Sequence, residues 1–142
     1  MAAPVPVAAD RIAPDFRSLP VNPNEGFPQS FLLGFAERTY RFEFYVNIAA
    51  EQIPTGAADP RRRLELTRAT GPAGGLRGML VGTITRQDSS GDVVLLRRRL
   101  LPGLQYTARE LLLTVEEMSL AMGNLNGVGN FGSVLTARVA LR

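Results

Sequence analysis

The stretch from Leu76 to Leu101 constrains the fold more than any other, because it has the pattern of a β-hairpin. Two segments rich in Val, Leu, Ile and Thr, LRGMLVGTITR and VVLLRRRLL, flank the linker QDSSGD. Branched apolar residues favour strands, whereas Asp and Ser bond to nearby backbone groups and Gly adopts positive φ, as turns require. The sequence therefore predicts a mainly β protein.

The aromatic stretch of residues 30–48 carries a second strand signal. From Arg38 to Val46, inward and outward positions alternate strictly, with Tyr40, Phe42, Phe44 and Val46 on one side and Thr39, Arg41, Glu43 and Tyr45 on the other. This period of two is typical of a half-buried strand, so Ser30–Leu33 and Arg38–Ile48 are expected to form a hairpin. The rings are expected in the core, although an exposed aromatic row would also suit base stacking.

The sequence predicts one helix, at residues 108–122. Thr107 and Glu110 match a capping box, and Gly123 fits a C-terminal cap. Apolar residues follow at spacings of four, three and four, which places them on one helical face: Leu111, Val115, Met118 and Met122. A strand through LLLTV followed by a turn is the alternative. A short strand is expected at 64–67 and a final strand at 133–141, with loops at 49–63 and 69–75.

The chain divides into an arm and a domain. Residues 1–28 hold six of the ten prolines and are expected to be extended, either packed along a neighbouring subunit or frayed. Residues 29–142 are expected to form a single β-rich domain, a small antiparallel barrel or sandwich. No apolar run approaches the roughly 18 residues of a spanning helix, and the start lacks the pattern of a secretory signal, so synthesis in the cytoplasm is expected.

The composition excludes several common kinds of catalytic site. The chain has no Cys, His or Trp, and all 16 of its basic residues are Arg. Thiol chemistry, His-dependent triads and Schiff-base lysines are therefore impossible. Asp88/Asp92 and Glu116/Glu117 are the remaining carboxylate pairs, and neither shows an evident pocket. We expect a non-enzymatic protein without a cofactor or a metal site.

Gly127, Gly129 and Gly132 match the pattern GxGxxG, but the dinucleotide interpretation fails. That site needs a following helix and an acidic residue about 20 positions further on. Here only ten residues follow, they resemble a strand, and none is acidic. The segment is interpreted instead as a loop that needs positive φ and close backbone approach.

Three groups of residues are candidate partner contacts. The first two are arginine triplets, Arg61, Arg62 and Arg63 in a loop and Arg97, Arg98 and Arg99 in the second hairpin strand. The third is the glycine loop, with Asn126, Gly127, Gly129 and Phe131. The loop triplet suits a solvated loop end or a phosphate contact, and the strand triplet suits a charged sheet edge or an interface.

Three segments together resemble the small β-rich structural proteins of tailed bacteriophages, particularly the hub or plug proteins of contractile-tail baseplates. They are FLLGFAERTYRFEFYVN, the hairpin ending in RRRLLPG, and the closing NLNGVGNFGSVLTARVAL. The resemblance covers about 29–142. It implies a non-enzymatic virion component, made in the host cytoplasm, that contacts other tail proteins and can form a homo-oligomer. The alternative is a basic β-barrel module that binds nucleic acid, which the net charge of +3 permits.

Overall fold

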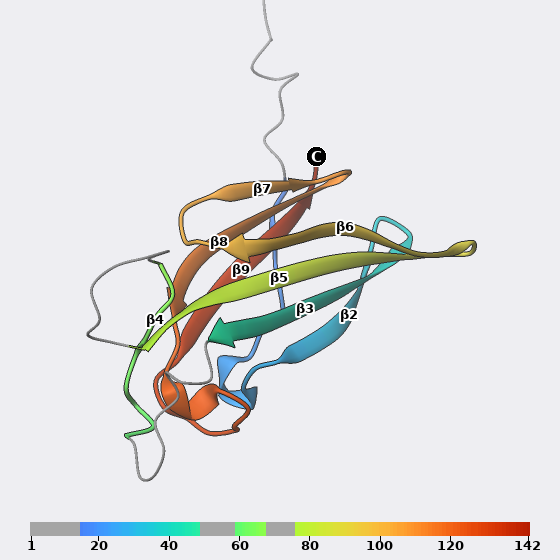
Figure 1. The fold of residues 1–142 in the computed structure, drawn as a ribbon. Coiled ribbons are helices and arrows are strands. Elements are labelled where there is room, and N and C mark those ends of the chain that lie inside the picture. Colours follow the sequence, from blue (N-terminus) through green and yellow to red (C-terminus); the bar gives the residue numbers. More distant parts are fainter. Residues whose placement is uncertain (1–14, 49–58, 68–75) are drawn as a thin grey trace, which may run out of the picture.

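Two antiparallel sheets of four strands each stack face to face in the computed structural model, which describes residues 15–48, 59–67 and 76–142 (Figure 1). Sheet I has the order β2 (Gln29–Phe35), β3 (Arg38–Ile48), β5 (Leu76–Asp88), β6 (Gly91–Leu100). Sheet II has the order β1 (Arg17–Ser18), β9 (Val134–Leu141), β8 (Leu111–Ser119), β7 (Gln105–Ala108). The mainly β prediction is confirmed. Of its two architectures the sandwich is right, since the sheets do not close into a barrel.

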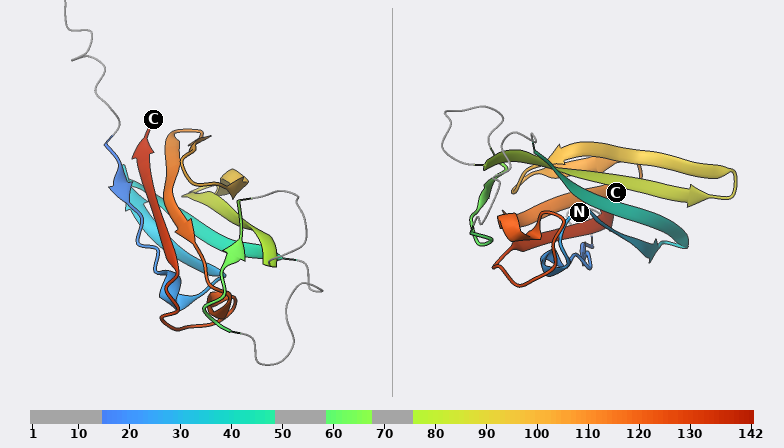
Figure 2. Two further views of the ribbon diagram at one scale, coloured as in Figure 1. Left: turned by 90° about the vertical axis from the view of Figure 1, so that its left-hand side faces the viewer. Right: turned by 60° about the horizontal axis from the view of Figure 1, so that its bottom comes forward.

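Short elements complete the fold. β4 (Leu64–Glu65) pairs in parallel with the first residues of β5, which confirms a short strand in the 64–67 segment. The 3-10 turns η1 (Pro23–Glu25) and η3 (Met122–Asn124) lie side by side at one end of the sandwich, as Figure 2 shows. The predicted loop at 69–75, most of the predicted loop at 49–63, and residues 1–14 of the predicted arm lie outside the described residues.

The aromatic stripe of β3 lies at the centre of the core, as its alternation predicts. Tyr40, Phe42 and Phe44 are each at most 1% exposed. On β2, the ring of Phe31 stacks on Phe42 with 5.5 Å between centroids. The same core cluster includes, from sheet II, Leu111, Leu113, Val115, Leu135 and Val139. Because these rings are buried, they offer no base-stacking surface.

Two-residue turns close both predicted hairpins of sheet I, which are confirmed. Ala36 and Glu37 join β2 to β3 with φ of 53° and 64°, the pair of positive values that a type I′ turn requires. Ser89 and Ser90 join β5 to β6, with Asp88 paired to Gly91. Neither side chain at the first turn is one that favours positive φ, so the hairpin is held by its strands rather than by its turn.

The helix predicted for residues 108–122 is wrong: β7 ends at Ala108 and β8 occupies Leu111–Ser119, so the alternative strand is correct. Within β8, Leu111 and Val115 both face the core, because every second residue of a strand lies on the same face. A bulge before Glu117 shifts this alternation, so that Met118 also packs against the core. The bulge thus produces the spacing of three that imitates a helical face. Glu110 caps nothing, since its carboxylate binds Arg86 and Tyr40.

Both ends of the described chain pack onto the sandwich. Leu19 and Phe27, from the segment predicted as an arm, are 7% and 2% exposed and belong to the core. The predicted final strand is confirmed as β9, which pairs with β8 on one side and with β1 on the other. In the part of the chain that the structure describes, no helix has the length and apolar character to span a membrane.

Candidate interaction surfaces

The glycine-rich segment that follows η3 folds around one buried amide. Asn124 is 1% exposed, and its Nδ2 donates to the carbonyl oxygens of Gly127 and Gly129 at 3.2 and 3.0 Å. Its Oδ1 accepts a hydrogen bond from Ser133 Oγ at 2.6 Å. These three bonds bring the two ends of the loop together and satisfy carbonyl groups that a strand ladder would otherwise pair.

The four predicted contact residues of this loop hold it against residues of the same chain. A Cβ on Gly26 would collide with the carbonyl oxygen of Gly127, and Gly129 N–H donates to Asn24 O at 2.8 Å. The half-buried ring of Phe131 fills the space that side chains at 123 and 129 would need. Asn126 has φ of 58° at the exposed side of the loop. The close backbone approach expected of these glycines is therefore made within the chain.

Arg61, Arg62 and Arg63 lie beside the glycine loop, so the fold brings two of the three predicted groups together. Met122 N–H donates to Arg62 O at 2.7 Å, and the Arg63 guanidinium lies against Gly132. All three arginines are exposed. This end of the molecule therefore presents a cationic surface next to a tightly packed loop.

Arg97, Arg98 and Arg99 lie apart from that surface, on β6. Because successive side chains of a strand point to opposite faces, the consecutive arginines cover both faces of sheet I, as predicted. Hydrogen bonding to Tyr45, together with the charge of Glu43, raises the pKa of the Arg97 guanidinium. Arg98 lies over the Tyr106 ring at 5.3 Å, and Arg99 Nη2 donates to Leu66 O at 3.0 Å. Each of these side chains is thus engaged within the chain.

Glu110 lies between the two sheets at the centre of a network of hydrogen bonds. Arg86 Nη1 donates to both carboxylate oxygens of Glu110 at 2.7 Å, and Tyr40 Oη donates to Glu110 Oε2 at 2.8 Å. Arg86 Nε donates to both oxygens of Asp88, at 2.9 and 3.0 Å. Arg86, Tyr40 and Asp88 come from sheet I, and Glu110 comes from the β7–β8 turn, so the network ties the two sheets together.

The pKa values follow from this geometry. Partial burial raises the pKa of Glu110, but the hydrogen bonds from Arg86, from its own backbone and from Tyr40 outweigh burial and lower it to about 2. Burial, followed by the hydrogen bond to Glu110, raises the pKa of Tyr40 to about 12. A general base works best with a pKa near neutrality, so the geometry of Glu110 is that of a structural cross-link.

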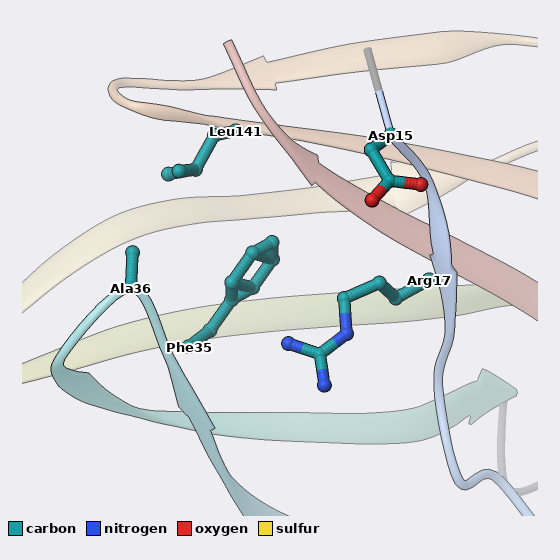
Figure 3. Close-up of a pocket in the computed structure, with 5 residues that line it drawn as sticks. All are labelled: Asp15, Arg17, Phe35, Ala36 and Leu141. Atoms are coloured by element: carbon teal, nitrogen blue, oxygen red, sulfur yellow. The ribbon is translucent and has the colours of Figure 1, made fainter.

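A pocket of about 320 Å³ opens between the sheets beside β1 and the β2–β3 turn (Figure 3). It is lined by Asp15, Arg17, Phe35, Ala36 and Leu141. Arg17 reaches across from β1 and places its guanidinium carbon 5.1 Å from the centre of the Phe35 ring. These described lining residues supply one cation, one carboxylate and apolar surface. Among the described residues, no three carboxylates gather closely enough to hold a metal ion.

The free edge of β2 is a further surface, which lies at one margin of sheet I. The seven residues QSFLLGF carry no charge, and their pairing with β3 runs without interruption from Gln29↔Phe44 to Phe35↔Arg38. Leu32, in the middle, is 58% exposed. Charged side chains, prolines and bulges are the usual devices that keep an exposed edge from pairing with another chain, and β2 contains none of them.

The other sheet margins do carry such devices. β6 has a bulge at Leu95 and the Arg97–Arg99 triplet. The margins of sheet II are short, since β1 has two residues and β7 has four. Among the strands that the structure describes, β2 is therefore the one long, regular and uncharged edge. Sequence reasoning missed this surface, although the lack of charge in QSFLLGF was a visible signal.

The chain matches no known protein-family model, and neither a curated protein nor a solved structure with significant similarity was found.

Proposed function

We propose that the chain is a non-enzymatic structural subunit of a bacteriophage tail, baseplate or tail-like particle, and that it acts through protein–protein contacts. The resemblance of its aromatic strand, its arginine-rich hairpin and its closing strand to small tail proteins supports this role. The strands Gln105–Ala108 and Leu111–Ser119 also support it, because a mainly β domain agrees with that resemblance.

The unprotected β2 edge is the single observation that carries the proposal. An edge with unpaired N–H and C=O groups and no charge is a template for a further strand. Proteins that add strands in this way gain affinity from main-chain hydrogen bonds and specificity from alternate side chains. A protein that functions as a monomer is expected to protect such an edge from pairing with another chain. The other sheet margins are protected in this way by a bulge, by arginines or by their short length.

Fractionation of assembled particles tests the proposal. Tagged full-length chain, produced in the cells that encode it, should sediment with particles in a density gradient at a fixed ratio to the other particle proteins. It should remain there after a wash at high salt and after nuclease treatment, because strand pairing is not ionic. A chain that stays at the top of the gradient contradicts the particle role. A chain released by salt or nuclease points to nucleic-acid binding through the arginine clusters.

A further inference from the structure

We infer that the β2 edge pairs with the β2 edge of a second copy of this chain, antiparallel and centred on Leu32. The pairing would join two copies of sheet I into one continuous sheet across a twofold axis. This inference rests on the proposed function, because it names the partner that the exposed edge takes.

The first argument is the direction in which the main-chain N–H and C=O groups of β2 point. In a hairpin with a two-residue turn, the residues that flank the turn bond to each other, so Phe35 and every second residue before it face β3. The main-chain groups of Ser30, Leu32 and Gly34 therefore point away from the sheet. None of these three groups bonds to another described residue. The edge offers three donors and three acceptors in a row.

The two ends of β2 fix the register of a self-pairing. Pro28 has no N–H to donate, and Ala36 lies in the turn at positive φ, so neither can extend an outer ladder. With Leu32 opposite Leu32, Ser30 lies opposite Gly34 on both sides of the axis. All three outward residues then pair with outward residues, giving six main-chain hydrogen bonds. A shift of two residues in either direction would set Pro28 or Ala36 against the ladder and lose a pair.

The side chains also match themselves in this register. On the outer face of sheet I, exposed Leu32 meets its own copy, and Ser30 meets Gly34, where an added Cβ would encounter nothing within 4 Å. On the inner face, half-buried Phe31 lies opposite Leu33 of the second copy. Apolar residues thus meet apolar residues and small residues meet small ones. No charge of β2 is buried, because β2 has none.

The absence of Cys makes disulfide trapping a direct test with the full chain. Oxidised Leu32→Cys should form a covalent dimer, since directly opposed residues have Cα atoms about 5.5 Å apart, within disulfide range. Val94→Cys is the matched control: Val94 is 57% exposed and lies on the outer face at the opposite margin of the same sheet. It should stay largely uncrosslinked.

Two further cysteine variants test the register. Ser30→Cys and Gly34→Cys should each crosslink poorly alone, because their copies lie about 13 Å apart along the strands. An equimolar mixture of the two should crosslink to about half of the chains, the fraction of mixed dimers expected from random exchange. A mixture that crosslinks no better than its components overturns this register.

Light scattering supplies the reversible measurement. The wild-type chain should show twice its mass of 15.4 kDa at high concentration. Leu32→Lys should raise the dissociation constant of the dimer by about a hundredfold, because two opposed ammonium groups repel and lose water. An unchanged circular dichroism spectrum would show that the exposed substitution leaves the fold intact.

The outcomes separate this inference from the proposed function. A chain that is monomeric at every concentration, with Leu32→Cys no more crosslinked than Val94→Cys, overturns self-pairing even if the chain still sediments with particles. Crosslinked dimers in a protein that never enters particles support self-pairing and contradict the particle role. An oligomer that survives Leu32→Lys must be held by another surface and also overturns the inference.

Discussion

Glu110→Gln should remove much of the cross-link between the two sheets. The pKa of Glu110 falls from 4.5 to about 2 in the folded chain, a difference that corresponds to about 3 kcal/mol of stability at neutral pH. The Glu110 side chain keeps 29% exposure, and solvent screening reduces the expected loss to about 2 kcal/mol. Because the folded pKa is lowered, this stabilisation is complete above about pH 4.5 and is lost as the pH falls toward 2.

Urea unfolding followed by circular dichroism at pH 7, 4.5, 3 and 2 measures this loss. The difference in free energy of unfolding between wild type and Glu110→Gln should be largest at pH 7 and should shrink as the pH falls below 4.5. Glu116→Gln is the control, since Glu116 is exposed and lies 3.8 Å from Arg138 in a surface ion pair, worth less than about 1 kcal/mol. Equal losses for the two variants at pH 7, or a constant difference down to pH 2, would refute the reasoning.

Two further predictions concern the turns and the glycine loop. Ala36→Asn with Glu37→Gly should raise the free energy of unfolding by about 1 kcal/mol, because those residues tolerate positive φ. The same Asn-Gly pair at Ser89 and Ser90, which do not have positive φ, should give no gain in thermal melts. Asn124→Ala should cost about 3 kcal/mol through three lost hydrogen bonds, whereas exposed Asn130→Ala should cost less than about 0.5 kcal/mol in the same urea assay. Equal costs for the two Asn variants would contradict the buried-amide account.

The sequence predicted the parts of the fold that depend on neighbouring residues. Strict alternation placed Tyr40, Phe42 and Phe44 in the core, and turn chemistry located the hairpin of residues 76–101. The failure at 108–122 has a physical cause: a bulge is not encoded by any residue type, and it changed the strand period at Glu116. The spacing of the apolar residues therefore favoured a helix, whereas in the folded chain this segment is a strand that pairs with β9.

The interaction surfaces depended on distant neighbours and were harder to predict. The pairing of Glu110 with Arg86 joins residues 24 positions apart, and no spacing rule connects them. The lack of charge in QSFLLGF was readable, but its meaning depended on β2 lying at a sheet margin. Likewise, the glycine loop was expected to contact something closely, and only the fold identifies that contact as Gly26 of the same chain.

Amide hydrogen exchange along β2, resolved by residue, tests the central claim that this edge is the assembly surface. In monomeric Leu32→Lys, the amides of residues 30, 32 and 34 should exchange much faster than those of Phe31 and Leu33, which bond to β3. In the assembled wild-type protein, all five should be protected alike. Fast exchange at 30, 32 and 34 in the assembled protein, with new protection in the glycine loop, would contradict the account.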